Sequence, residues 1–266
     1  LSGGGLAAAW AWVGLVLVIS IGIPYFSIIA SSLIKLRGYG LAPGNFTLEH
    51  YAELFTTDRS LGAIGNSIFL AIASACICSV LGTAVVMAVR RGKGRLAKAV
   101  EGVSMLPEML PAIVLVIGIM LFWNTVYDVL PLYNTMGIMV LAYVVLYLPY
   151  TIQYVTSAFT QINDSLIQAG RTFGGSPWYV FRRITLPMIA PGILTGWMMI
   201  FIIAFRELVT ASLIAPPNVL VVSTYINREF EQGSVSLGMA MAVLCVAITT
   251  TTLLILNAVT GRKKAS

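Results

Sequence analysis

Three ionisable residues lie inside long apolar stretches of this 266-residue sequence, where charged side chains are rare. Glu108 stands between two prolines in SMLPEMLPAIVL, and Arg206 and Glu207 adjoin in FRELVT. Because a charge at the centre of a bilayer costs on the order of 2.5 to 3.5 kcal/mol, such side chains face protein or water. They predict a polar path through a membrane. For Glu108 the alternative is a solvated charge at a helix end. For Arg206 and Glu207 the alternative is a structural ion pair that holds helices together.

The sequence offers no residue set for catalysis or for holding a metal ion. Its one histidine, His50, lies in a polar segment and is expected to be solvated, and its three cysteines, Cys76, Cys78 and Cys245, lie in apolar stretches. No HExxH, no Ser/His/Asp set and no GxxxxGK[ST] motif occurs. We therefore expect no catalytic residue, no metal site, no disulfide and no cofactor bound by this chain.

Composition excludes a soluble domain. Hydrophobic residues make up 58% of the chain, charged residues only 10%, and the mean hydropathy is +0.91. These values are typical of a polytopic membrane protein. The formal net charge of +6 does not indicate nucleic acid, because the basic residues form short clusters between apolar runs.

Six apolar runs predict an all-α fold, a single transmembrane domain over residues 1–266 with six membrane-spanning helices. The spans are expected at roughly 6–33, 61–89, 101–123, 137–157, 189–213 and 237–259. Pro107 and Pro111 should interrupt the third span, since proline breaks the helical hydrogen-bond ladder. In the fourth, four tyrosines share one face and indicate helix packing, an aromatic belt at the membrane interface or a polar path; they are Tyr143, Tyr147, Tyr150 and Tyr154.

Most basic residues fall in three segments, which predicts the orientation of the chain. The clusters are Arg90, Arg91, Lys93, Arg95 and Lys98; Arg171, Arg182 and Arg183; and Arg262, Lys263 and Lys264. Basic loops stay on the cytoplasmic side, so with six spans both termini should lie in the cytoplasm, in a bacterial-type inner (plasma) membrane. The opening LSGGG is a native start, a linker or a trimmed end.

The segment 158–188, between the fourth and fifth spans, predicts two short helices joined by a tight turn. Residues 162–172 should form the first helix, which Gly174 ends in a left-handed conformation. Ser176 as N-cap and Pro177 at the first position should start the second helix. Its apolar face is expected to hold Trp178, Val180, Phe181 and Ile184.

The spacing of this segment resembles a known loop. The matching positions are Gln168-Ala169-Gly170, then Gly174 after three residues, Ile184 after nine more, and Leu186-Pro187 after one more. The segment is similar to the E-A-A loop of permease subunits in type I binding-protein-dependent ABC importers. The chain departs from that pattern at Gln168, usually glutamate, and at Gly170, usually a second alanine. The first departure puts in doubt any charge pairing that the family glutamate makes with the ATPase.

The resemblance implies a function and partners. The loop would be the cytoplasmic coupling helix that docks on an ATPase, through Gln168, Ala169, Gly170, Gly174, Ser176, Pro177, Trp178, Phe181, Ile184, Leu186 and Pro187. Two ATP-binding-cassette subunits carrying ATP and Mg, a second permease half (same, different or fused chain) and an extracytoplasmic substrate-binding protein would complete the importer in the lipid bilayer. Glu108, Arg206 and Glu207 would line the translocation pathway, which works by alternating access.

The cargo is the least constrained feature. The segments FRELVTASLIAPP and STYINREFEQG resemble ferric-iron-type permeases, so ferric iron is the expected solute, with polyamine, thiamine or aminoethylphosphonate as alternatives. An ion-coupled secondary transporter or a channel, a different class, would use the same buried charges but not the coupling loop.

Overall fold

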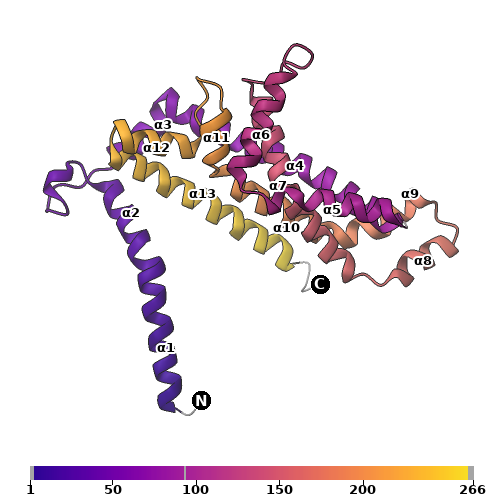
Figure 1. The fold of residues 1–266 in the computed structure, drawn as a ribbon. Coiled ribbons are helices and arrows are strands. Elements are labelled where there is room, and N and C mark those ends of the chain that lie inside the picture. Colours follow the sequence, from indigo (N-terminus) through magenta and orange to yellow (C-terminus); the bar gives the residue numbers. More distant parts are fainter. Residues whose placement is uncertain (1–2, 93, 263–266) are drawn as a thin grey trace. The chain divides into compact units, whose positions relative to one another are not determined.

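Helices make up almost the whole of the structure, a computed structural model that describes residues 3–92 and 94–262 (Figure 1). Leu1, Ser2, Lys93, Lys263 and Lys264, used above for the N-terminal and topological arguments, lie outside these residues. Five helical runs are long and apolar enough to cross a membrane: Gly3–Leu33, Asp58–Arg91, Met136–Thr160, Pro177–Phe205 and Val235–Ile255. A bent pair, α5 (Arg95–Met109) and α6 (Ala112–Thr125), makes a sixth span if counted as one. The all-α polytopic fold is therefore confirmed.

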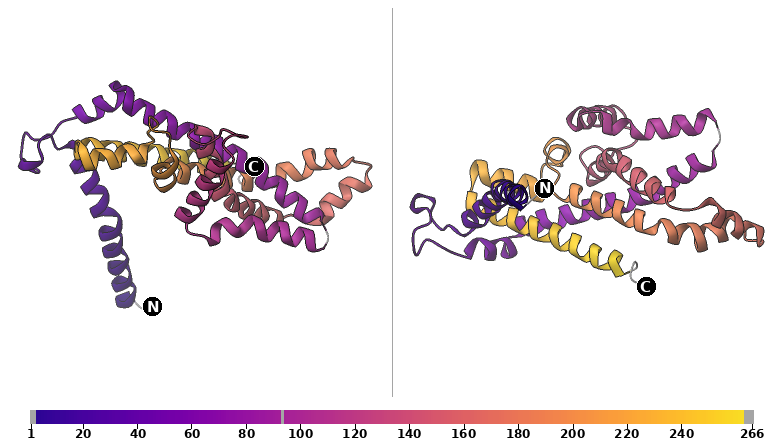
Figure 2. Two further views of the ribbon diagram at one scale, coloured as in Figure 1. Left: turned by 45° about the horizontal axis from the view of Figure 1, so that its top comes forward. Right: turned by 90° about the horizontal axis from the view of Figure 1, so that it is seen from below.

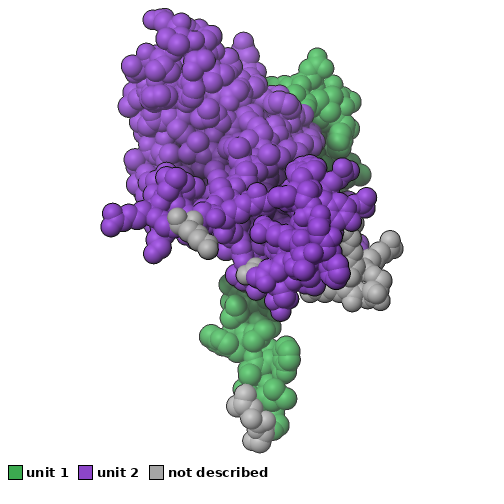
Figure 3. Space-filling view, turned by 90° about the vertical axis from the view of Figure 1, so that its right-hand side faces the viewer, with its two compact units in different colours: residues 1–62, 222–248 green, residues 63–221, 249–266 purple. Residues whose placement is uncertain are grey.

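The chain divides into two compact units, coloured separately in Figure 3. The first comprises residues 1–62 and 222–248, and the second comprises residues 63–221 and 249–266. Two long helices, α4 (Asp58–Arg91) and α13 (Val235–Arg262), contribute residues to both units.

The first unit opens with α1 (Gly3–Leu17) and α2 (Ile23–Leu33), joined by a π-helical turn at Val18–Gly22. Pro24 lacks the amide hydrogen that the helical ladder needs, which accounts for the irregular turn just before it. No side chain of α1 is buried. An apolar helix exposed on all sides is typical of a segment that lies in lipid or against another subunit.

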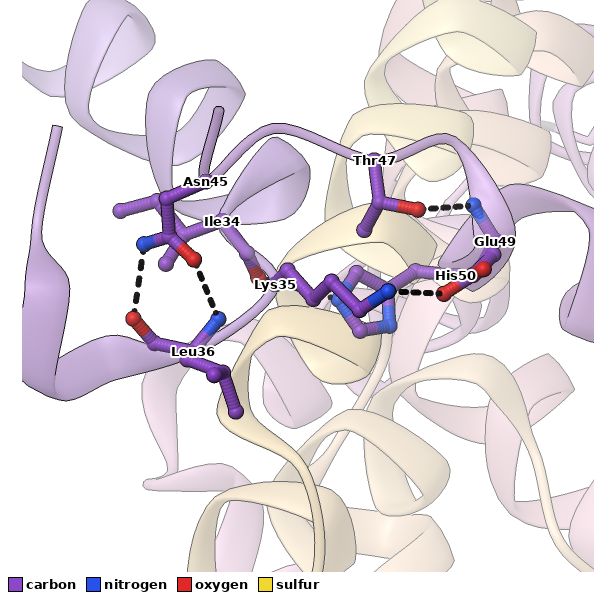
Figure 4. A network of polar contacts seen from close by, with 7 residues as sticks. All are labelled: Ile34, Lys35, Leu36, Asn45, Thr47, Glu49 and His50. Atoms are coloured by element: carbon purple, nitrogen blue, oxygen red, sulfur yellow. Dashed lines mark hydrogen bonds and ion pairs between the residues drawn. The ribbon is translucent and has the colours of Figure 1, made fainter. Parts of the chain in front are cut away.

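Between α2 and α3 (Glu49–Thr56) the chain forms a loop held by one asparagine (Figure 4). The Asn45 side chain accepts a hydrogen bond from Leu36 N (2.9 Å) and donates to Leu36 O (2.7 Å) and Gly40 O (2.8 Å). His50, expected to be solvated, is half-buried, and its Nε2 lies 3.1 Å from Ile34 O. The loop is thus an ordered segment.

In the same unit, α12 (Val222–Gln232) turns sharply into α13. Glu229 Oε2 accepts a hydrogen bond from Ser234 N (3.2 Å), and Phe230 packs where a Cβ on Gly238 would stand, 2.7 Å away. Burial, reinforced by the carboxylates of Glu229 and Glu53 and opposed by Arg59, raises the pKa of Tyr225 to about 12. Its phenol is therefore neutral at physiological pH.

In the second unit, α7 (Met136–Thr160) and α10 (Leu186–Phe205) lie side by side (Figure 2). Glycines on α10 allow the contact: a Cβ on Gly192 would stand 2.5 Å from Ala158 Cβ, and one on Gly196 would stand 3.3 Å from Thr151 Cα. Beside this contact, a buried cluster joins α4, α7, the residue Ile162 that follows α7, and α10: Val86, Ile152, Val155, Phe159, Ile162 and Ile189. Close packing here makes α7 the centre of the unit.

Two spans differ from their expected form. The third, expected over 101–123 with an interruption at its two prolines, is broken only before Pro111 and bends there by 109° between α5 and α6, because Leu110 is extended, as residues before proline tend to be, and Pro111 cannot continue the ladder. The fifth, expected over 189–213, runs from Pro177 through a π-helical turn at Phe181–Thr185 and ends at Phe205. Val209–Ile214 then forms a separate short helix, α11.

Candidate functional site

The segment between α7 and α10 folds as a helical hairpin at one end of the second unit, away from α6 and α11 (Figure 1). Its first helix, α8 (Asp164–Thr172), begins two residues later than expected, with the Asn163 side chain accepting from Ser165 N at 3.0 Å. Gly174 has φ +82° and its amide donates to Arg171 O (2.9 Å), while the Gly175 amide donates to Gly170 O (3.0 Å). This is a Schellman turn, so the predicted left-handed glycine is confirmed.

The second helix of the hairpin starts as the sequence predicts. Ser176 Oγ accepts a hydrogen bond from Tyr179 N at 3.2 Å, and Pro177 occupies the start of α9 (Pro177–Val180). The end differs, because α9 continues through the π-helical turn into α10 without interruption. The second helix of the hairpin is therefore the first part of a helical run, Pro177–Phe205, that is long enough to cross a membrane.

The apolar residues of α9 do not share one face, contrary to the expectation. Val180 is buried, and Val180 and Ile184 pack on Gly170, where a Cβ would stand 2.5 Å from Ile184 Cδ1. Trp178 is 67% exposed and pairs with Phe181, the ring centroids 5.6 Å apart. The reason is helical geometry, since residues two positions apart point about 200° apart.

Four large apolar side chains of the hairpin are exposed in this chain. They are Leu166, Phe173, Trp178 and Tyr179, with Phe173 91% exposed; Trp178 also borders a groove beside α4. Sequence reasoning missed Phe173 and Tyr179, although aromatic residues beside a glycine turn were a usable signal. Gln168, Ala169 and Pro187 are also exposed, and Leu186 packs on the buried cluster. Exposed apolar side chains of this kind are typical of a surface that contacts a protein or a membrane.

Glu108 lies in the last turn of α5, just before the bend. Its Oε2 accepts a hydrogen bond of 2.5 Å from Gln153 Nε2 of α7, and both side chains are exposed within this single chain. The carboxylate is thus hydrogen-bonded to α7, and its exposed side can contact solvent, lipid or a partner subunit.

Glu207 lies in the break between α10 and α11 and caps the short helix. Its two carboxylate oxygens accept hydrogen bonds from Thr210 N (3.0 and 2.9 Å), and Oε2 accepts one from Ala211 N (3.3 Å). Tyr143 of α7 also hydrogen-bonds to this carboxylate. The Arg206 side chain, by contrast, is exposed at the end of α10.

Helix α7 is therefore the common neighbour of both acids. Gln153 and Tyr143 are ten positions apart, which places them about 15 Å apart along the helix axis. Tyr143 and Tyr147 are buried with ring centroids 5.9 Å apart, which favours the packing interpretation of the tyrosine stripe. Within the described residues, no three His, Cys, Asp or Glu side chains gather as a metal site.

These features together define a class. Broken apolar helices with polar residues at the breaks, together with a helical hairpin continuous with one span, are typical of a membrane transport protein.

Residues 80–265, more than half of the chain, match the family of binding-protein-dependent transport system inner membrane components, and the chain belongs to that family. It is a permease subunit of an importer, not itself catalytic.

Individual relatives agree with this assignment. The chain is similar to the spermidine/putrescine transport system permease protein PotC of Haemophilus influenzae, 26% identical over 73% of each chain. It is also similar to the putative 2-aminoethylphosphonate transport system permease protein PhnV of Salmonella typhi, 24% identical over 92% of each chain. Its fold matches a bacterial ABC transporter that imports the acidic polysaccharide alginate, with a TM-score of 0.77 and 17% identity over 97% of this chain and 95% of the other.

Proposed function

We propose that this chain forms one half of the translocation path of an ATP-driven importer, with Glu108 and Glu207 as polar stations beside α7. The observation that carries the proposal is that each acid stands at a break in a membrane helix. Helix breaks are tolerated at membrane depth where they line a cavity or are buried in protein. Arg206, exposed beside Glu207, would add a positive charge to the same part of the path.

The partners follow from the family and from the exposed hairpin. Two ATP-binding-cassette subunits, which bind ATP and Mg, would dock on the hairpin, and a second permease half would complete the path. A substrate-binding protein would deliver cargo on the extracytoplasmic side. The clusters of arginine near the hairpin support a cytoplasmic position for it, and both termini would then lie on that side.

Coupling would run through the uninterrupted helix from Pro177 to Phe205. ATP-driven closure of the ATPase pair moves the hairpin, and the π-helical turn and α10 carry that motion to the break at Arg206. The result is a population shift between inward-open and outward-open packings, set by the difference in partner affinity for the two states.

For cargo we favour a small solute with an ammonium group. The two relatives named above transport polyamines and, putatively, 2-aminoethylphosphonate, and both compounds carry primary amines. Carboxylates at Glu108 and Glu207 provide attraction for such a group. The expected ferric iron stays a prediction that neither relative's name supports.

The test is uptake into proteoliposomes that contain the assembled importer and its binding protein, with ATP inside. A panel of labelled spermidine, 2-aminoethylphosphonate, thiamine, ferric iron and trehalose, the cargo in a further relative's name, separates the candidates. ATP-dependent uptake of an amine supports the proposal. Uptake of iron or trehalose alone would contradict the cargo, and uptake driven by an ion gradient without ATP would contradict the mechanism.

A further inference from the structure

An apolar groove of about 830 Å³ runs along the second half of α4 and the start of α10. Val80, Ala84 and Met87 of α4 and Leu186 and Ile193 of α10 contribute to its walls. From Ser79 to Arg91, the α4 residues at its limits, the helix rises about 18 Å. The groove therefore follows the span from membrane depth to its basic end.

A second, polar cavity of about 210 Å³ adjoins this groove at the root of the hairpin. The two share Met87, Arg91, Pro177 and Phe181 among their lining residues. The polar cavity is lined further by Arg90 and Arg171, and no acidic side chain lines either hollow among the described residues. Arg90 lies over the Phe159 ring, 4.8 Å from its centroid.

We propose that the two hollows form one site for an anionic phospholipid, its phosphate among the three arginines and its acyl chain in the apolar groove. Guanidinium groups bind phosphate oxygens by paired hydrogen bonds, and basic pockets between spans on the cytoplasmic side bind anionic headgroups. The positive charge of one hollow matches the headgroup of a lipid, and the apolar walls of the other match its acyl chain. A free phosphate ion would occupy only the first hollow.

The position gives the lipid a role. Arg171 belongs to α8, Phe181 to the π-helical turn and Arg91 to α4, so a lipid bound there bridges the hairpin and the span beside it. The site therefore links membrane composition to the stiffness of the coupling element, whatever the cargo.

The experiment measures lipid retained by the assembled importer after detergent exchange, by mass spectrometry, with dioleoyl phosphatidylglycerol and dioleoyl phosphatidylcholine offered as competitors. Wild type should retain phosphatidylglycerol preferentially. Arg91→Gln and Arg171→Gln should each weaken that preference about fivefold, whereas Arg95→Gln, which removes an equal charge outside both cavities, should leave it unchanged. Ala84→Phe, which fills the groove, should reduce retention with all three arginines present.

Equal retention by wild type and the arginine variants would overturn the proposal. So would displacement of phosphatidylglycerol by millimolar inorganic phosphate, which would indicate a free-anion site. Loss of the ATP-binding subunit from the Arg91 and Arg171 variants with lipid retention intact would show that the arginines contact protein instead.

Discussion

The amide of Gly175 donates to the carbonyl oxygen of Gly170 at 3.0 Å, and a Cβ on residue 175 would stand only 2.6 Å from that same oxygen. The turn of the hairpin therefore depends on a missing side chain. Because the oxygen belongs to the backbone of α8, it cannot rotate away as a side chain could.

Adding a methyl group at the turn should loosen the hairpin. Gly175→Ala forces the two backbones apart, at a cost of about 1 to 3 kcal/mol, and Gly174→Ala places alanine at φ +82°, at a cost of about 1 to 2 kcal/mol. Both should raise the ratio of ATP hydrolysed to solute transported. Gly102→Ala, on α5 with open space around it, is the matched control, and unchanged coupling in both hairpin variants would refute the role of the turn.

The alanine that the E-A-A pattern usually carries at position 170 should fit here only after Ile184 moves. A methyl group at residue 170 would meet Ile184 Cδ1, the end of a flexible side chain, at 2.5 Å, so Gly170→Ala should gain less thermal stability from its helix propensity in the wild-type background than in an Ile184→Val background. The size of this difference, about 1 kcal/mol, is read from a double-mutant cycle. Additive effects would mean that the two side chains do not press on each other.

We expect solute uptake to depend on the negative charge of Glu108 at its position beside α7. Glu108→Gln should reduce uptake about tenfold, the effect of about 1.4 kcal/mol on the barrier, without loss of partner subunits. The swapped variant Glu108→Gln with Gln153→Glu moves the charge across the same hydrogen bond and should recover part of the uptake. Undiminished uptake by the single variant would demote Glu108 to a solvated helix-end charge.

Glu207 should have both a structural and a transport effect. Glu207→Gln keeps an oxygen to cap α11 but loses the charge, and hydrogen bonds to a charged group are stronger by about 1 kcal/mol. We expect a modest loss of stability and a larger loss of uptake. Tyr143→Phe serves as the comparison, since it removes one partner of the carboxylate and leaves the charge in place; equal uptake losses in both variants would point to packing alone.

The sequence was most informative where structure is set by near neighbours. Ser176 and Pro177 start a helix and Gly174 ends one through contacts within a few residues, so the turn was predictable from residue types. The break after Phe205 was not, because it depends on how the Glu207 side chain reaches the amides of Thr210 and Ala211. An acid three residues before the first amides of a short helix was a weak signal beside a continuous apolar run.

Contacts between distant segments were beyond sequence reasoning. The two prolines predicted an irregular third span but could not fix a bend of 109°. The pairing of Glu108 with Gln153 joins residues 45 positions apart, and no local pattern indicates it. The face of α9 was predicted wrongly because Trp178 and Val180, both apolar, were assigned together although the helix separates them.

The central claim is that the hairpin binds the ATP-hydrolysing partner, and a pull-down of the native complex tests it most directly. Phe173→Ala with Tyr179→Ala removes two exposed aromatic side chains of the hairpin that line neither hollow, while Phe122→Ala with Trp123→Ala removes two aromatic side chains of α6. Loss of an aromatic anchor costs about 2 kcal/mol or more, roughly thirtyfold in affinity. We expect the ATP-binding subunit to be retained by wild type and by the α6 variant and to be lost from the hairpin variant. Equal recovery of that subunit with all three would contradict it.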